Sequence, residues 1–169
     1  HTKFKGVISD AGGPTANMYG FECDKKLNEG CCDDKRCTSP SLCPLMKPDH
    51  SQQMSLLKKL AAVDGVRKVF VASGIRYDLI IEDKQYGRKY LIQLVNTHTS
   101  GQLKVAPEHT DDSVLRLMGK PSSASLSQFN AMFSEAASHS EKDQFLTYYL
   151  IAAVRRPAVP SAILAAGAG

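Results

Sequence analysis

The chain alternates between short apolar runs of the β type and longer amphipathic stripes of the helical type. The β-type runs are rich in branched and aromatic side chains, and they cover residues 4–10, 66–72, 102–106 and 144–152. The helical stripes place apolar side chains three and four positions apart, and they cover residues 49–63, 86–95, 111–118 and 126–137. Thr110 is the expected N-cap of the third helix. Residues 23–48 lack a steady period and predict an irregular excursion.

This order of elements predicts an α/β fold. Strands that alternate with helical crossovers run parallel, in either a doubly wound sheet or an arc of a (β/α) barrel. About four strands are too few to close an eight-stranded barrel. We expect one domain over residues 1–152 with a cysteine-rich insert at 22–48, followed by an alanine-rich, frayed tail at 153–169.

Composition excludes several classes of protein. The chain has 169 residues, of which 43% are hydrophobic and 22% charged, as in an ordinary globular domain. The formal charge of +4, from 21 basic and 17 acidic residues, is too small to demand a nucleic-acid partner. No apolar run approaches the ~18 residues of a membrane span. The N-terminus also lacks a signal-peptide pattern, so we expect a cytoplasmic protein.

The cysteines all lie in one short segment, and His50 follows them. They are Cys23, Cys31, Cys32, Cys37 and Cys43. An odd number without a signal peptide favours reduced thiols with metal or redox roles over a secreted disulfide framework. Thiolate ligands suit zinc or an iron–sulfur cluster. Adjacent Cys31 and Cys32 do not readily bind one tetrahedral ion, so a solvent-exposed, partly oxidised loop is the alternative.

Polar residues follow three of the predicted strands, next to Gly or Pro. The segments are residues 10–15, 73–78 and 104–109. Ligands of α/β proteins bind at the carboxyl ends of parallel strands, so we expect these loops to form a site for a polar ligand. Alternatively, glycine and proline merely end the strands. The P-loop, Rossmann and nucleophile-elbow motifs do not occur in the sequence, which argues against the enzymes that depend on them.

The roles of three further residues follow from their places in the sequence. Lys104 lies between Leu103 and Val105 in the third strand, where its ammonium group either faces solvent or meets an acidic group of a ligand. His98 and His109 lack a ligand-type partner at helical spacing, so we interpret them as polar loop residues rather than metal ligands.

The same loops carry a family resemblance. The strings ISDAGGPTANMYG (residues 8–20), KVFVASGIRYDL (68–79) and SGQLKVAPEHTDDSVLRLMGKP (100–121) resemble the YgiQ-type radical S-adenosylmethionine family. The resemblance covers roughly residues 3–151. It implies a partial (β/α) barrel that binds S-adenosylmethionine and a [4Fe-4S] cluster and performs radical chemistry on a substrate that the sequence does not identify.

The resemblance also implies which residues bind the cofactor. Gly12 and Gly13 would approach the methionine amino group, with Pro14 and Thr15 where many relatives carry Glu. The later loops would line the nucleoside and the carboxylate through Ser73, Arg76, Lys104 and Glu108. A side chain at either glycine is expected to block this approach, and glycine also suits a backbone with positive φ.

Two features depart from the family pattern. The family's C-x3-C-x2-C cluster motif precedes the Gly-Gly strand and does not occur in this sequence. Cys23, Cys32, Cys37 and Cys43 instead resemble a second cysteine-rich insert of the family, with Cys31 as an addition, and we assign them an auxiliary zinc or cluster site. The family's His-Pro-Gly loop after the fourth strand is replaced by the alanine-rich tail.

The leading interpretation is a fragment of a radical S-adenosylmethionine enzyme. Because the cluster motif is missing, we expect this chain alone to be inactive in reductive cleavage of the cofactor. The alternative is a non-enzymatic metal-binding interaction module built on the cysteine-rich insert.

Overall fold

The computed structural model describes residues 3–13, 15–33 and 36–151, so Pro14 and the predicted tail at 153–169 lie outside the described residues. The elements follow in the order β1 (Val7–Ile8), the 3₁₀ turn η1 (Ala16–Met18), α1 (Asp24–Glu29), α2 (Ser51–Ala61), β2 (Lys68–Val69), α3 (Tyr77–Glu82), α4 (Gly87–Gln93), the π-helical turn η2 (Leu94–His98), β3 (Gln102–Glu108), α5 (Asp112–Met118), α6 (Ser123–Ser138) and β4 (Phe145–Leu150).

The strands pair in parallel. β1 pairs with β2, and β3 pairs with β4, with Gln102 opposite Phe145. A parallel bridge between Ile75 and Val105 links the segment after β2 to β3. The structure is therefore α/β with short parallel strand pairs that follow one another in chain order. The longer barrel arc stays a prediction.

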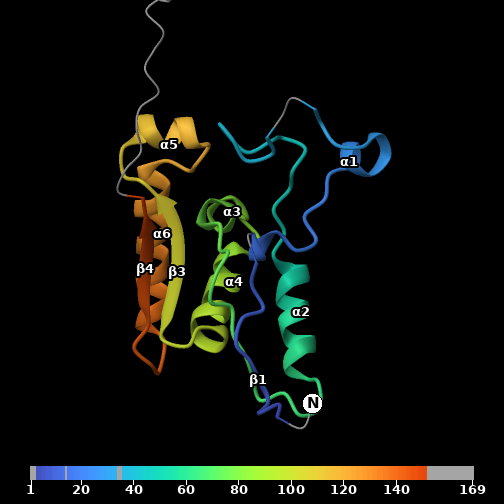
Figure 1. The fold of residues 1–169 in the computed structure, drawn as a ribbon, viewed down its shortest axis with the longest axis vertical. Helices are drawn as coiled ribbons and strands as arrows, with labels where there is room; N and C mark the ends of the chain where they lie inside the picture. The colour runs from blue at the N-terminus through green and yellow to red at the C-terminus, as the bar shows by residue number, and fades with distance from the viewer. Residues whose placement is uncertain (1–2, 14, 34–35, 152–169) are drawn as a thin grey trace, which may run out of the picture.

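Helices pack against the strands and against one another. α2 packs against β2 and α4, while α6 packs against α3 and α4 (Figure 1). β3 and its parallel partner β4 run toward the end of the molecule where α5 lies, and the excursion of residues 23–48 occupies the same end. The carboxyl ends of β3 and β4 therefore open toward α5 and the excursion.

The core forms where the helices meet the strands. Phe129 of α6, Tyr90 of α4 and the β3 side chains Leu103 and Val105 belong to one buried cluster. Successive side chains of a strand point to opposite faces. Lys104, between the two buried residues, therefore lies on the face away from the core, and its side chain is exposed.

Two helices fall where the sequence predicts irregular chain. α3 buries Leu79 and Ile80 but spans only six residues, too few to display a helical period. α1 lies inside the cysteine-rich excursion, where Cys23 acts as its N-cap and the Sγ atom accepts a hydrogen bond from the Lys26 amide at 3.4 Å. The excursion is therefore not uniformly irregular.

The predicted boundaries need further corrections. The runs over 4–10 and 66–72 contain only the two-residue strands β1 and β2. Asp111, not Thr110, is the N-cap of α5, because its carboxylate accepts hydrogen bonds from the amides of Ser113 at 2.8 Å and Val114 at 3.3 Å. The predicted helix over 86–95 ends as an α-helix at Gln93 and continues as the π-helical turn η2.

Candidate functional site

A pocket opens at the carboxyl ends of the strands, and we call it the strand-end pocket. Its volume is about 360 Å³, within the range of small-molecule sites. It is lined by Thr15, Ser73, Gly74, Ile75, Arg76, Lys104, Val105, Ala106, Lys120 and Tyr149. The structure thus brings together residues from all three loops that the sequence singled out, including the predicted binding residues Thr15, Ser73, Arg76 and Lys104.

The Gly-Gly loop lies beside this pocket rather than in it. Gly12 and Gly13 line a neighbouring hollow of about 320 Å³, and Thr15 lines both spaces. The loop is held by backbone hydrogen bonds from the Ala11 amide to the Phe70 carbonyl at 2.6 Å and from the Ala16 amide to the Gly74 carbonyl at 2.7 Å. The loop after β1 is therefore fastened to the segment after β2.

The two glycines differ in their surroundings, and neither has a positive φ, so the expectation of a left-handed backbone is wrong for both. A Cβ atom on Gly12 would collide with the Asp10 carboxylate and lie 2.8 Å from the Ser73 carbonyl oxygen. A Cβ atom on Gly13 would meet no atom within 4 Å among the described residues. The surrounding atoms of the protein therefore require glycine at position 12 but not at position 13.

The backbone conformation and the close neighbours of Gly74 both require glycine at this position. Its φ is +76°, and a Cβ atom there would overlap the carbonyl oxygen of Gly13. Only glycine combines this left-handed backbone with such a close approach. The loop after β2 thus needs its glycine in order to contact the loop after β1.

Asp10 joins the same two loops through its side chain. One carboxylate oxygen accepts a hydrogen bond from the Ala72 amide at 2.9 Å, and the other accepts one from the Ser73 hydroxyl at 2.6 Å. Burial acts to raise the pKa of Asp10, but these bonds and those from the Gly12 and Ser73 amides outweigh it, so the pKa lies below its ordinary value. The sequence placed Asp10 next to the Gly-Gly pair, and this adjacency was the signal that it belonged to the site.

A buried polar network holds the backbone of Arg76. The Asn17 side chain accepts a hydrogen bond from the Arg76 amide at 2.7 Å and donates one to the Arg76 carbonyl at 2.9 Å. The Asn17 Nδ2 atom also lies 3.2 Å from His50 Nε2, and His50 Nδ1 lies 2.8 Å from Asp83 Oδ2. The sequence offered no local signal for this network, because its members lie 33 to 59 positions apart.

The cations around the strand-end pocket have different partners. The Arg76 guanidinium binds the Asp78 carboxylate through two hydrogen bonds, of 2.6 and 3.1 Å. The Lys120 ammonium binds Glu108 Oε1 at 3.1 Å. Lys104 forms no ion pair with any residue in the described part of the chain. The Lys104 side chain is exposed and lines the strand-end pocket, and its contact with an acidic group of a ligand stays a prediction.

Glu108, a predicted cofactor-binding residue, lies behind the strand-end pocket. It does not line the strand-end pocket but reaches it through its partner Lys120. Its φ of 72° is left-handed, and its Oε2 atom is buried without a hydrogen-bond partner among the described residues. Strained backbone of this kind occurs often at binding sites.

The cysteines are not assembled into a preformed metal site. All five are free thiols, and Cys31 and Cys37 are exposed. Cys43 packs instead beside a small apolar cluster that contains Phe21 and Met46. Within residues 3–13, 15–33 and 36–151, no three His, Cys, Asp or Glu side chains are grouped as metal ligands require. The thiols as arranged here do not fit a metal ion.

Three of the histidines, His50, His98 and His109, have partners within the protein. His50 is buried, and both ring nitrogens have partners, so it is not available to a metal. His98 is buried rather than a loop residue, and its Nδ1 atom lies 2.8 Å from the Val69 carbonyl oxygen. The His109 Nδ1 atom accepts a hydrogen bond from the Asp111 amide at 2.9 Å. The structure thus gives each of these three histidines a structural partner.

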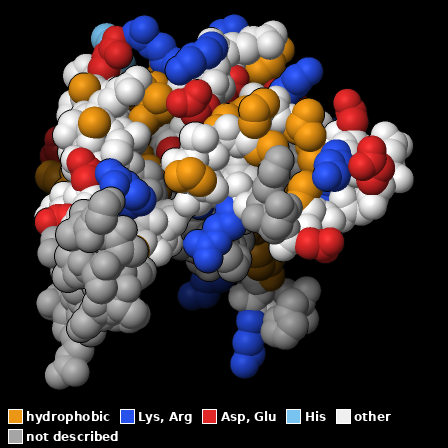
Figure 2. All heavy atoms as spheres, turned by 90° about the horizontal axis from the view of Figure 1, so that it is seen from above, with side chains coloured by type: hydrophobic (Ala, Val, Ile, Leu, Met, Phe, Trp, Pro, Cys, Tyr) orange, Lys and Arg blue, Asp and Glu red, His pale blue; other side chains and the backbone are white. Residues whose placement is uncertain are grey.

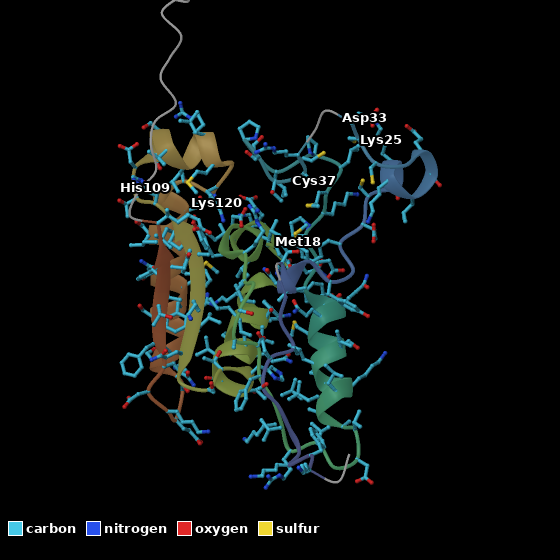
Figure 3. All side chains as sticks on the ribbon, viewed as in Figure 1. Met18, Lys25, Asp33, Cys37, His109 and Lys120 are labelled. Carbon is cyan, nitrogen blue, oxygen red and sulfur yellow. The ribbon has the colours of Figure 1, made fainter. Side chains whose placement is uncertain are left out.

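The loop-bearing face carries both charge signs. Lys and Arg side chains are interspersed there with acidic and hydrophobic ones (Figure 2). In Figure 3, Lys120 and His109 lie near α5, while Cys37 and Asp33 lie across from them on the excursion. No helix in the described ranges combines the length and apolarity needed to cross a bilayer.

Comparison with known proteins identifies relatives of this chain. It is 52% identical over 151 residues to a UPF0313 protein of Fusobacterium nucleatum, 44% over 148 residues to one of Clostridium perfringens, and 43% over 150 residues to one of Pseudomonas syringae pv. tomato. These alignments cover 88 to 89% of the chain but only 27%, 22% and 19% of the relatives.

The chain therefore spans about a quarter or less of the length of its UPF0313 relatives. No protein-family profile and no solved structure matches it. The names of the relatives state no activity.

Proposed function

We propose that this chain is the S-adenosylmethionine-binding part of a radical S-adenosylmethionine enzyme. The cofactor occupies the strand-end pocket, with its methionine amino group toward the adjoining hollow beside Gly12 and Gly13, and the [4Fe-4S] cluster belongs to the parent protein, with ligands outside this chain. The similarity of residues 8–20, 68–79 and 100–121 to that class supports the proposal, and kinship with UPF0313 proteins is compatible with it.

One observation carries the proposal most directly. Three loops that are far apart in the sequence meet at one end of parallel strands, around a pocket of ligand size. Residues from each of the three similar strings line that pocket: Thr15, Ser73, Arg76 and Lys104. A mere strand-ending role for the glycines and prolines would not require the polar side chains of these loops to converge.

The chemistry of the pocket suits a zwitterionic nucleoside. An amino-acid carboxylate needs a cationic donor, and Lys104 has no ion-pair partner among the described residues. An ammonium group needs acceptors, which the backbone carbonyls at the strand ends offer. The hydroxyl groups of Thr15 and Ser73 can hydrogen-bond a ribose. When bound, the cofactor supplies the radical chemistry, while the chain binds and orients it.

Arg76 contributes in a different way. Its guanidinium is already paired with Asp78, so it acts as a fixed, partly neutralised wall of the pocket. Asn17 holds its backbone in place through both the amide and the carbonyl. This arrangement preorganises the loop after β2, which lowers the entropy that a ligand loses on binding.

The cysteines of this chain are not assigned the radical-generating cluster. They lack the C-x3-C-x2-C spacing, and the structure does not group them as metal ligands within the described residues.

Calorimetric titration of the chain with S-adenosylmethionine tests the proposal. We expect weak but saturable binding, because the cluster iron that would bind the methionine end is not held by this chain. Lys104→Ala should weaken binding by about tenfold, the scale of one charge-assisted contact. Gly13→Val should weaken binding too, because the added side chain would occupy the adjoining hollow toward which the methionine amino group points. Gly13→Val is informative because a Cβ atom there meets no atom within 4 Å among the described residues, so a loss of affinity in a folded variant reflects the ligand.

Lys58→Ala is the matched control, since Lys58 is exposed on α2 and lines neither the strand-end pocket nor the glycine hollow. It should bind the cofactor as the unaltered chain does. Absence of saturable binding, or equal affinity in Gly13→Val, Lys104→Ala and Lys58→Ala, would show that the pocket is not the cofactor site.

A further inference from the structure

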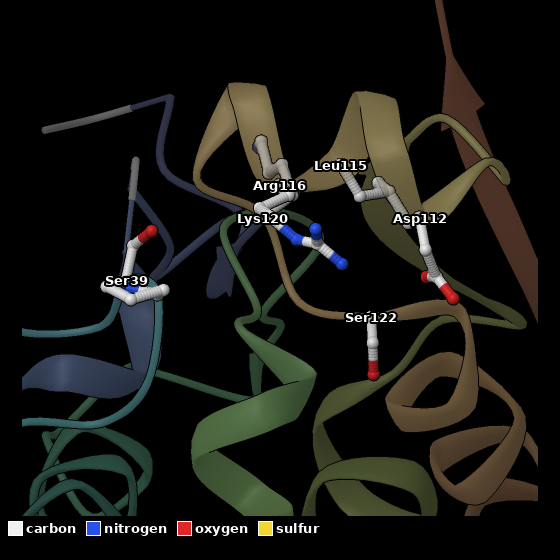
Figure 4. Close-up of a pocket in the computed structure, with 7 residues that line it drawn as sticks. Ser39, Asp112, Leu115, Arg116, Lys120 and Ser122 are labelled. Carbon is white, nitrogen blue, oxygen red and sulfur yellow. The ribbon is translucent and has the colours of Figure 1, made fainter. Parts of the chain in front are cut away.

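A third hollow lies where the cysteine-rich excursion meets α5, and we call it the α5 pocket (Figure 4). Its volume is about 200 Å³. It is lined by Ser39, Pro40, Asp112, Leu115, Arg116, Lys120 and Ser122. The walls thus come from three segments, namely the excursion, α5 and the turn between α5 and α6.

Cationic side chains gather around this hollow. Arg116 in the last turn of α5 and Lys120 just beyond it line the pocket. Arg36 reaches the same place from the excursion, since a Cβ atom on Gly119 would lie 2.9 Å from its Nη1 atom and 3.1 Å from Ser39 Oγ. Gly119, with φ of +66°, therefore leaves room for Arg36 and Ser39 to lie against the end of α5.

The carboxylates nearby do not neutralise these cations fully. Asp112 uses its two oxygens to accept hydrogen bonds from the Ser123 amide at 2.7 Å and the Ser123 hydroxyl at 3.1 Å. Glu108 pairs with Lys120. In the part of the chain that the structure describes, neither Arg36 nor Arg116 forms an ion pair. Among the described residues, three cations thus face two carboxylates, which leaves net positive charge there.

A purely structural role accounts for only part of this arrangement. Cations stabilise the C-terminal end of a helix through its dipole. Two of the last carbonyls of α5 are already satisfied, however, because the Gly119 amide donates to Arg116 O at 3.2 Å and the Lys120 amide donates to Leu115 O at 2.9 Å. Helix capping also does not explain why the excursion supplies a further arginine and a serine hydroxyl at the same hollow.

We propose that the α5 pocket binds a tetrahedral oxyanion of the phosphate class. Arginine guanidinium groups offer planar pairs of N–H donors that match phosphate oxygens, and Lys120 adds a point charge. Ser39 supplies a hydroxyl from the opposite wall. An anion there would neutralise charge from the excursion and α5 together, and so hold these two segments against each other.

The shared residue Lys120 connects this site to the strand-end pocket, because it lines both hollows. We infer that the phosphate group belongs to a small-molecule substrate whose remainder points toward the strand-end pocket. This assignment of the anion to a substrate rests on the proposed function, whereas oxyanion binding by the α5 pocket does not.

The test is a titration of the chain with inorganic phosphate at constant ionic strength, with chloride as the replaced ion, followed by NMR chemical shifts. We expect saturable shifts that include the amides of residues 116 to 120. Arg116→Gln and Arg36→Gln should each weaken phosphate binding by about tenfold. Arg88→Gln is the control, because Arg88 is an exposed arginine of α4 that pairs with Glu135 and lies outside the pocket.

The outcomes separate the two proposals. Non-saturable shifts, or equal weakening by Arg88→Gln, would overturn the oxyanion site. Phosphate binding that depends on Arg116, in a chain that does not bind S-adenosylmethionine, would uphold the oxyanion site and overturn the proposed function. Binding of S-adenosylmethionine without binding of phosphate would uphold the proposed function and overturn the oxyanion site. Arg116→Gln should leave cofactor affinity unchanged, since Arg116 does not line the strand-end pocket.

Discussion

The Nδ1 atom of His50 lies 2.8 Å from Oδ2 of Asp83, and the two side chains are 0% and 2% exposed. The backbone amide of His50 donates to the same oxygen, also at 2.8 Å. The carboxylate accepts from Nδ1–H, which leaves Nε2 as an acceptor for the Asn17 amide group at 3.2 Å. The pairing therefore sets a neutral His50 in one tautomer.

The His50–Asp83 pair supports the strand-end pocket through Asn17, which contacts both His50 and the backbone of Arg76. Asn17 can donate to His50 and hold both backbone groups of Arg76 only in one orientation of its side-chain amide. Tyr90 stacks on the His50 ring at 4.5 Å between centroids, so the network is also packed into the core. The loop that carries Arg76 is thus tied to the most buried part of the protein.

Stability should fall as the pH drops below neutrality. Burial lowers the pKa of His50 below its ordinary value of 6.5, although the Asp83 bond opposes this, and burial lowers the pKa of His98 likewise. Protons therefore bind the unfolded chain more readily, so the free energy of unfolding decreases as pH falls through 6.5 toward the lower folded-state pKa values. Each pKa unit of depression contributes about 1.4 kcal/mol.

Urea unfolding between pH 8 and pH 5, with NMR titration of the histidine rings, measures this effect. His50→Gln should be less stable at pH 8 and should lose part of the pH dependence. His139→Gln, which alters an exposed histidine, should keep the full pH dependence of the unaltered chain. A His50 ring that titrates at or above 6.5 in the folded protein would contradict the prediction.

Gly74→Ala should destabilise the chain more than a left-handed backbone alone explains. An alanine forced to positive φ costs about 1–2 kcal/mol. At Gly74 the added Cβ would also overlap the Gly13 carbonyl oxygen, so the two loops at the strand-end pocket must separate. We expect a loss of more than about 3 kcal/mol in the free energy of unfolding, since strain and the lost backbone contact add.

Gly65→Ala provides the comparison. Its φ of +80° is close to that of Gly74, but a Cβ atom there meets nothing within 4 Å among the described residues. Chemical denaturation of both variants isolates the contribution of the loop contact. Equal losses of stability would mean that the contact between the two loops does not hold the pocket together.

The sequence of the excursion predicts that Cys23, Cys32, Cys37 and Cys43 bind a metal ion or cluster. Because the thiols are not grouped in this structure, binding must rearrange the excursion. Elemental analysis of anaerobically purified protein should find near-stoichiometric zinc or iron. Cys37→Ser should abolish the metal, whereas Cys31→Ser, which changes a thiol outside the predicted set, should retain it.

Metal-free protein from anaerobic purification, or equal loss in Cys37→Ser and Cys31→Ser, would contradict this assignment. The solvent-exposed loop would then be the correct description of the excursion. Circular dichroism of both variants checks that neither substitution unfolds the chain.

The hydrophobic pattern predicted most of the regular elements because their periods are local. The helical stripe over 126–137 falls inside α6 (Ser123–Ser138), and the apolar run over 144–152 contains β4 (Phe145–Leu150). The pattern did not predict short elements, because they contain too few residues to show a period. α3 (Tyr77–Glu82) makes fewer than two turns, and so its burial of Leu79 and Ile80 shows no period.

The sequence by itself thus determined which loops carry polar and glycine residues after the strands, because composition and order are written along the chain. Only the tertiary structure decided which of these residues share a space. Lys104 and Thr15 meet at one pocket, Glu108 reaches it only through Lys120, and His50 pairs with Asp83 instead of joining the cysteines. These outcomes depend on parallel pairing and packing between segments distant in sequence, which set distances that no local pattern encodes.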